Sequence, residues 1–289
     1  RVAVRRPDLA GYLQPIGQVG QIHAVQANLR YPDSVKAAVR DADAVVNLVG
    51  ILFESGKQRF DAVMAAGAET VARAAAAAGA PLVHVSAIGA DAKSASHYAR
   101  AKAEGERRVL AADAAAIVMR PSIVFGPEDD FFNRFAGLAC LSLALPLPGG
   151  GHTRMQPVFA GDVAEAIAKA VVGELKPGAI YELGGPDVRT FKQLMQFVLA
   201  TTGRCRLLVP VPFAVMTLQA TFLQFWPKPP ITPDQVELLK RDNVVADDAK
   251  RDGRTLEGIG ITPESIDVIV PTYLWRFRKT GQFKPHAAE

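Results

Sequence analysis

Short apolar segments alternate with longer helix-like segments over the first 120 residues, and this rhythm limits the folds open to the chain. The apolar segments are residues 44–49, 82–86 and 116–119, and an alanine-rich segment at 60–78 ends before Gly79. Strands that alternate with helices predict a parallel, doubly wound α/β sheet. Residues 44–49 are apolar except for Asn47, which predicts a strand covered on both faces.

Weaker elements precede this alternation and a mixed region follows it. Further strands are predicted at residues 1–4, 22–26 and 181–183, and further helices at 31–40, 98–112, 158–172, 190–202 and 233–240. After Gly126 the alternation stops, and proline and glycine gather at residues 146–151. We therefore predict a second, smaller α-rich lobe in the C-terminal half.

Composition excludes several classes of function. The chain has 289 residues, of which 49% are hydrophobic and 21% charged, so it is globular rather than disordered. Its net charge is only +4 with scattered basic residues, which does not indicate a nucleic-acid partner. The two cysteines and five histidines show no metal-ligand spacing, so we expect no metal site. We expect a reducing, cytoplasmic environment.

Ser86, Tyr98 and Lys102 form the strongest candidate catalytic set. Ser86 ends an apolar strand, whereas Tyr98 and Lys102 are four residues apart and share one face of a helix. The Lys102 ammonium favours the phenolate form of Tyr98, which can then exchange a proton with a substrate oxygen held by Ser86. A half-buried tyrosine beside a solvated lysine is the alternative interpretation. Ligands of doubly wound sheets bind beyond the carboxyl ends of the strands, where Ser86 is expected, and this favours catalysis.

Several motifs together resemble a known family. They are VNLVG at 46–50, VHVSAIGA at 83–90, YARAK at 98–102, RPSIVFGPEDDFFNRF at 120–135, QPVFAGDVAEAI at 156–167 and LLKRDNVV at 238–245. The chain resembles the extended or atypical short-chain dehydrogenases/reductases, which are epimerase/dehydratase-like. The last three motifs are most similar to the branch that contains the dehydrogenase-like accessory subunit of respiratory complex I and its bacterial relatives.

This resemblance implies a division of the chain and a cofactor. Residues 1–125, with about 155–185, would form a Rossmann-like dinucleotide-binding domain, and 126–154 with 186–289 a small substrate or partner lobe. The cofactor would be NADP(H), bound in the full-length protein. Arg5 and Arg6 would accept its 2′-phosphate, although a solvated basic loop is the alternative. Further implied cofactor contacts are Asn28, Leu48, Val49, Gly50, Lys102, Pro121 and Ser122.

The first strand and the glycine-rich turn of the family have no counterpart in residues 1–50. That turn holds the pyrophosphate with backbone amides and a helix N-terminus. We therefore expect the natural protein to carry roughly 30 more N-terminal residues, about one strand-turn-helix unit. Because the first strand is central in the usual order, the strand at residues 1–4 is expected to lack a neighbour toward residues 44–49.

Three regions of the C-terminal half have two interpretations each. Asp129, Asp130 and Asn133 either face a cleft or begin a capped helix. Residues 211–226 carry no charge, so we expect them to pack into the small lobe, with docking to a membrane or partner as the alternative. Residues 273–284 interleave aromatic and basic side chains, which suits an anionic membrane surface or a protein groove, or else a solvated tail.

Two functions follow from the residues and the resemblance. The first is an accessory or assembly factor of NADH:ubiquinone oxidoreductase, with complex I subunits as partners and structural NADPH. The alternative is an active NADP-dependent oxidoreductase or epimerase that acts on a carbonyl, sugar or quinone-related substrate, for example in ubiquinone metabolism. We expect a cytoplasmic protein, peripheral on the inner face of a respiratory membrane.

Overall fold

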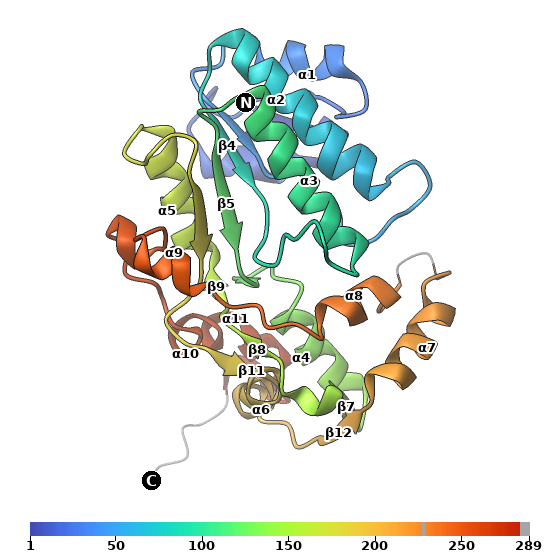
Figure 1. Cartoon of the computed structure of the whole chain (residues 1–289). Coiled ribbons are helices and arrows are strands. Elements are labelled where there is room, and N and C mark those ends of the chain that lie inside the picture. Colours follow the sequence, from blue (N-terminus) through green and yellow to red (C-terminus); the bar gives the residue numbers. More distant parts are fainter. Residues whose placement is uncertain (227–228, 284–289) are drawn as a thin grey trace. The chain divides into compact units, whose positions relative to one another are not determined.

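The computed structural model describes residues 1–226 and 229–283 (Figure 1). The chain forms two compact units, each described here by itself. Unit 1 comprises residues 1–86, 90–119 and 167–180, and unit 2 comprises residues 87–89, 120–166 and 181–289. The division predicted from the sequence, after residue 125 and again near residues 155 and 185, remains a prediction.

The main sheet has the strand order β10-β5-β4-β3. Its strands are β3 (Val45–Asn47), β4 (Leu82–Val85), β5 (Ile117–Pro121) and β10 (Ile180–Leu183), of which the last two continue from unit 1 into unit 2. β4 pairs in parallel with both β3 and β5. The predicted α/β class with a parallel sheet is confirmed.

Two N-terminal strands form a separate parallel pair. β1 (Val2–Val4) pairs with β2 (Ala24–Gln26), and within the described residues β1 has no strand neighbour toward β3. The expectation that residues 44–49 are covered on both faces is wrong, because β3 is an edge strand of its sheet and leaves Val46, Leu48 and Val49 exposed.

The helices of unit 1 pack closely because their facing residues are small. Their bounds are α1 (Pro32–Val39), a π-helical turn η3 (Asp61–Ala65) that continues into α2 (Ala66–Ala78), α3 (His97–Ala112), and the 3-10 turns η1 (Pro7–Leu9) and η2 (Gly11–Ile16). α2 ends at Gly79, whose φ of 69° is left-handed. A Cβ atom on Gly105 of α3 would lie 2.2 Å from the Met64 carbonyl oxygen, so only glycine allows this approach.

Unit 2 surrounds an aromatic and aliphatic core that includes Phe125, Phe132, Met195 and Leu274. Three strand pairs join β6 (Val124–Phe125) to β9 (Val158–Phe159), β8 (Arg154–Met155) to β11 (Arg189–Thr190), and β7 (Ala144–Pro148) to β12 (Leu207–Val211). The helices are α4 (Phe132–Leu141), α5 (Ala160–Val171, shared with unit 1), α6 (Phe191–Thr202), α7 (Phe213–Leu223), α8 (Pro233–Leu238), α9 (Asp247–Arg251), α10 (Ile266–Ile269) and α11 (Pro271–Leu274). Short 3-10 turns are η4 (Gly149–Gly151), η5 (Glu257–Ile259), η6 (Trp275–Phe277) and η7 (Gly281–Phe283).

Two predictions for the C-terminal half are corrected by this arrangement. The helix predicted at 158–172 begins only after β9, because Val158 and Phe159 pair with β6. The charge-free segment 211–226 does not pack into the lobe as expected. Its helix α7 buries Met216 and Ala220 against Val236 and leaves most of its other large apolar side chains exposed.

Two observations bear on a membrane location. Of the helices that the structure describes, none has the length and apolar character needed to cross a bilayer. The predicted amphipathic segment 273–284 falls in α11, η6 and η7, except that its last residue, Lys284, lies outside the described residues.

Candidate functional site

Lys102 is buried at the carboxyl end of the sheet in unit 1. Only 5% of its surface is exposed, and its ammonium donates a hydrogen bond to the Val85 carbonyl at the end of β4 (3.1 Å). A Cβ atom on Gly50 would lie 3.6 Å from Lys102 Nζ, so position 50 directly adjoins the ammonium. The alternative interpretation of a solvated lysine is therefore wrong.

The protonation of Lys102 is shifted by its surroundings. Burial lowers the pKa of Lys102 to about 8, and the charge of Glu106, one turn along α3, opposes that shift. The ammonium form still predominates at neutral pH. Lys102 thus offers a positive charge in a buried site, where electrostatic interactions are stronger than in water.

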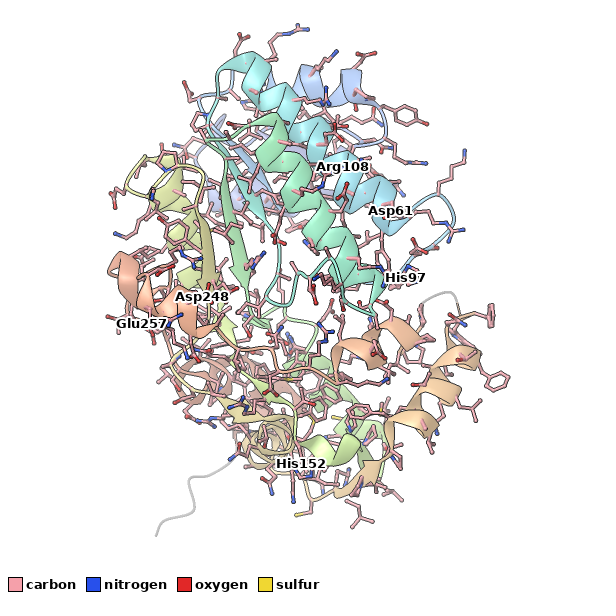
Figure 2. All side chains as sticks on the ribbon, viewed as in Figure 1. Asp61, His97, Arg108, His152, Asp248 and Glu257 are labelled. Carbon is pink, nitrogen blue, oxygen red and sulfur yellow. The ribbon has the colours of Figure 1, made fainter. Side chains whose placement is uncertain are left out.

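Tyr98 lies one turn before Lys102 on the same face of α3. Its ring packs edge-on against Phe60, with ring centroids 6.0 Å apart, and the Lys102 ammonium lies 5.9 Å from the Tyr98 ring centroid. Figure 2 labels His97, the residue just before Tyr98 at the start of α3, and Arg108, near the opposite end of that helix. The i, i+4 placement predicted from the sequence is thus present.

Ser86 follows β4 directly and continues its ladder. Its N–H donates to the Met119 carbonyl (2.7 Å), and its side chain is 4% exposed. Within the described part of the chain the Ser86 hydroxyl has no hydrogen-bond partner. A buried hydroxyl without a partner is costly, so this group is available to a ligand or to ordered water.

A buried pair, Asn47 and His84, was missed from the sequence. His84 is 2% exposed, and its Nδ1 lies 3.1 Å from the Asn47 side-chain nitrogen across the β3–β4 pair. Burial, and secondarily the charge of Lys102, lower the pKa of His84 to about 3, so the imidazole is neutral. Its position two residues before Ser86 in a strand was the available signal, because such residues share a face.

Arg5, Arg6 and Asn28 follow the ends of β1 and β2. These strand ends are adjacent, since the Ala27 N–H donates to the Val4 carbonyl (2.9 Å). Both arginines are exposed, but Arg6 forms an ion pair with Asp8 at 2.7 Å, a neutralising partner that sequence reasoning missed. The Asn28 side-chain oxygen accepts a hydrogen bond from the Arg30 N–H, which leaves its amide nitrogen for other contacts.

The remaining predicted cofactor contacts divide between the two units. Leu48, Val49 and Gly50 follow β3 in unit 1. Pro121 and Ser122 lie in unit 2, where the Ser122 hydroxyl donates to the Asn243 side-chain oxygen (2.5 Å). Asn243 belongs to the LLKRDNVV motif and was not singled out as a contact.

The acidic segment of unit 2 begins a helix. Asp129 accepts hydrogen bonds from the N–H groups of Phe132 and Asn133 at the start of α4, and from the Tyr273 hydroxyl. The capped-helix interpretation is therefore confirmed for Asp129. Among the residues that the structure describes, no group of three metal-ligating side chains is placed to hold a metal ion.

Comparison with curated proteins identifies relatives, several of which match nearly the whole chain. NADH dehydrogenase (ubiquinone) 1 alpha subcomplex subunit 9, mitochondrial, from Arabidopsis thaliana is 32% identical over 95% of this chain and 70% of that protein. The protein of the same name from Mus musculus is 31% identical over 95% of this chain and 74% of its own length. A ceramide reductase from Caulobacter vibrioides is 31% identical over 51% of this chain and 45% of its own.

Solved structures share the fold at lower identity. An Escherichia coli NADPH-dependent quinone oxidoreductase complexed with NADPH superposes with a TM-score of 0.71 at 18% identity, over 94% of this chain and 89% of that one. The dTDP-glucose 4,6-dehydratase of Streptomyces venezuelae with NAD bound gives 0.69 at 20% identity, over 96% and 86%. The profile of the NAD dependent epimerase/dehydratase family matches residues 3–184. This chain therefore belongs to the NAD dependent epimerase/dehydratase family.

Proposed function

We propose that this protein is an accessory or assembly factor of NADH:ubiquinone oxidoreductase, respiratory complex I, and that it binds NADP(H) as a structural cofactor. The observation that carries this proposal is the identity of 31–32% to mitochondrial subunits of that enzyme over 95% of the chain. The match extends well beyond residues 3–184, which the family profile covers, and so includes the C-terminal lobe.

The buried end of the sheet in unit 1 fits a nicotinamide dinucleotide. Gly50 adjoins Lys102, and the unpartnered hydroxyl of Ser86 offers a buried polar contact. Lys102 would hold the nicotinamide ribose by charge-assisted hydrogen bonds. Arg5 is expected to meet a 2′-phosphate more readily than Arg6, because Asp8 already pairs with Arg6. This is the basis for proposing NADP rather than NAD.

Purification of the natural full-length protein from its own cells tests this proposal. We expect NADP(H) to co-purify in near-stoichiometric amount, and a Lys102→Met variant to lose it. Deletion of the gene is expected to lower the level of assembled complex I on native gels. Tyr98→Phe is expected to restore that level, because a structural cofactor needs no proton transfer. Normal complex I assembly after deletion contradicts the accessory function.

An active oxidoreductase is the second candidate, favoured by the presence of Ser86, Tyr98 and Lys102 on one unit. When bound, the nicotinamide supplies or accepts the hydride. Tyr98 would pass a proton to or from the substrate oxygen, and Lys102 would stabilise the phenolate by its charge. NADPH oxidation with a soluble quinone as probe distinguishes the candidates. Turnover that Tyr98→Phe abolishes supports the enzyme, and the absence of turnover in the wild type contradicts it.

The exposed helix α7 supports a peripheral location on the inner, cytoplasmic face of a respiratory membrane. Phe222 is 72% exposed, and Phe225, just past the helix, is 82% exposed and stands next to the exposed Trp226. Exposed aromatic side chains insert favourably at the boundary between lipid headgroups and acyl chains. Co-sedimentation with phosphatidylglycerol vesicles is expected for the wild type and is expected to be lost in Phe222→Ser/Trp226→Ser. Equal sedimentation of both contradicts the membrane contact.

A further inference from the structure

Acidic residues are absent from three segments that build one part of unit 2. Residues 131–161, 188–232 and 268–283 contain no aspartate or glutamate, although arginine or lysine occurs in each. The segments meet in one core, because Phe132 of α4 and Leu274 of α11 belong to the same buried cluster, to which α6 also contributes. α4, α6 and the paired strands β7 and β12 therefore belong to one body without negative side chains (Figure 1).

A turn near the C-terminus brings cations to the end of α6. The Arg204 Nε–H donates to the Phe277 carbonyl (3.0 Å), and the Arg278 Nε–H donates to the Thr201 carbonyl in the last turn of α6 (2.9 Å). Lys279, the next residue, is exposed. These contacts place three positive charges beside one another. Arginine at a helix C-terminus stabilises the last carbonyl groups, which accounts for part of this arrangement.

Arg206 adds a fourth cation at the end of α4. Its Nε–H donates to the Ala139 carbonyl in the last turn of that helix (2.8 Å). We call this set the cation cluster; its members are Arg204, Arg206, Arg278 and Lys279. Within the described part of the chain, no carboxylate forms an ion pair with any of the four. The arginines of β8, of β11 and of the loop after α9, in contrast, pair with aspartates.

Exposed leucines adjoin the cation cluster. Leu141 is 91% exposed and lies two residues after Ala139, whose carbonyl binds Arg206. Leu143 and Leu207 are also exposed, and the Leu207 N–H donates to the Leu143 carbonyl (3.1 Å). Apolar area and uncompensated positive charge are therefore neighbours on the surface of unit 2. Helix capping by the arginines does not require these leucines to be exposed.

We infer that the cation cluster and these leucines form a docking surface for anionic phospholipid headgroups. A bilayer presents phosphates at its surface and acyl chains directly below, so it complements the cations and the leucines together, whereas an acidic protein surface complements the cations alone. In Arg204 and Arg278 only the Nε–H has a hydrogen-bond partner among the described residues, which leaves the Nη groups for lipid phosphate. The inference rests on the peripheral membrane location proposed above. It adds a preference for anionic lipid, which the uncharged segment 211–226 cannot supply.

Co-sedimentation of the full-length protein with two kinds of vesicle tests this inference. One kind is phosphatidylcholine alone, and the other also contains phosphatidylglycerol. We expect affinity to be at least about tenfold higher for the anionic vesicles and to fall at high salt, because salt screens the attraction. Arg206→Gln/Lys279→Gln is expected to lower that affinity about tenfold or more, since each cation near an anionic surface strengthens binding.

Two further variants separate headgroup binding from other effects of substitution. Lys250→Gln/Arg251→Gln is the matched control, because it removes two exposed charges from α9, where Asp247 and Asp248 are close. It is expected to bind within about threefold of the wild type. Arg206→Lys/Lys279→Arg keeps both charges while it alters the bond to the Ala139 carbonyl, and it is also expected to bind within about threefold.

Three results overturn the inference but not the membrane location. They are equal affinity of the wild type for neutral and anionic vesicles, wild-type affinity in Arg206→Gln/Lys279→Gln, and a loss in Arg206→Lys/Lys279→Arg as large as that in the glutamine variant. The last of these would assign the effect to helix capping. If the wild type binds neither kind of vesicle, the proposed membrane location is wrong as well, and the cation cluster faces an acidic protein instead.

Discussion

Apolar side chains are usually buried and polar side chains exposed, and two regions of the molecule depart from this rule in opposite directions. One is the polar interior of unit 1, and the other is the apolar surface of α7 in unit 2. In unit 1, Asn47, His84, Ser86 and Lys102 are buried beside the carboxyl end of a sheet. In unit 2, α7 (Phe213–Leu223) presents apolar side chains to solvent. Buried polar groups and exposed apolar patches are the informative exceptions to the rule, because neither is needed to hold a soluble fold together.

The two regions differ in their effect on the free energy of unfolding. Burial of charged groups opposes folding unless hydrogen bonds and charges compensate, and burial lowers the pKa values of Lys102 and His84, which favours their neutral forms. Exposed apolar side chains on α7 cost little in water, because they are similarly exposed in the unfolded chain. The interior polar groups are therefore expected to control stability against pH, whereas the α7 surface is expected to control association.

The largest expected effect is acid destabilisation through His84. Its pKa is about 3 in the fold and 6.5 in a model peptide, so the unfolded state binds more protons between these values. Stability from this group is complete above pH 6.5 and is lost as pH falls toward 3. The full shift corresponds to about 5 kcal/mol, of which roughly 3 kcal/mol is lost by pH 4.

Urea denaturation at pH 7 and pH 4 measures this effect. The free energy of unfolding of the wild type is expected to fall by roughly 3 kcal/mol more than that of His84→Gln. His23→Gln is the matched control, because it also replaces a histidine by glutamine in unit 1 but at an exposed position. Parallel pH profiles for wild type and His84→Gln would show that the buried imidazole is not responsible.

Lys102→Met is expected to raise stability while removing the cofactor site. Burial lowers the pKa of Lys102 from 10.5 to about 8, so at pH 7 the charged form opposes folding by about 3 kcal/mol. Loss of the bond to Val85 offsets roughly 1 kcal/mol of the gain. The free energy of unfolding of the wild type is expected to rise from pH 8 to 10, because the Lys102 amine keeps its proton to a higher pH in the unfolded state than in the fold. Lys102→Met is expected to lack this rise.

Chemical denaturation and NADPH titration of the same samples check the prediction for Lys102. Lys93→Met is the control, because Lys93 lies on the surface of unit 1. It is expected to leave both stability and NADPH affinity near the wild-type values. If Lys102→Met is less stable than the wild type at pH 7, the buried ammonium stabilises the fold, which contradicts the expectation that it opposes folding.

The two faces of α7 are expected to respond oppositely to substitution. Met216→Ala removes a buried side chain that packs against Val236, and is expected to cost about 2 kcal/mol. Leu218→Ser/Phe222→Ser changes exposed positions, and is expected to alter the free energy of unfolding by less than roughly 1 kcal/mol in total. In vesicle co-sedimentation the two variants are expected to differ in the opposite sense. Met216→Ala is expected to keep vesicle binding, and Leu218→Ser/Phe222→Ser is expected to lose it.

Local signals explain which elements the sequence predicts well. The helix at residues 190–202 carries a capping box formed by Thr190 and Gln193, and α2 ends at a left-handed Gly79. β9, in contrast, depends on pairing with residues 124–125, more than thirty positions away, and the period of residues 158–172 is helical throughout. Long-range pairing, which no local pattern encodes, decides such segments.

The same distinction applies to the candidate site. The spacing of Tyr98 and Lys102 is a helical property and is readable from the sequence. The burial of Lys102 depends on the approach of α3 to the sheet, and the Asn47–His84 contact depends on the register of β3 against β4. The π-helical turn and the fit of Gly105 against Met64 are likewise tertiary properties.

The smallest expected effect separates two buried serines of unit 1. Ser96 caps α3 by accepting a hydrogen bond from the Ala99 N–H, so Ser96→Ala is expected to cost about 1 kcal/mol. Ser86→Ala removes a buried hydroxyl without a partner in the described chain, so its cost is expected to be below roughly 0.5 kcal/mol. Differential scanning calorimetry of both variants measures the contrast. If Ser86→Ala destabilises as much as Ser96→Ala, the Ser86 hydroxyl contributes to the stability of the fold; a smaller loss means that the fold does not depend on this buried hydroxyl.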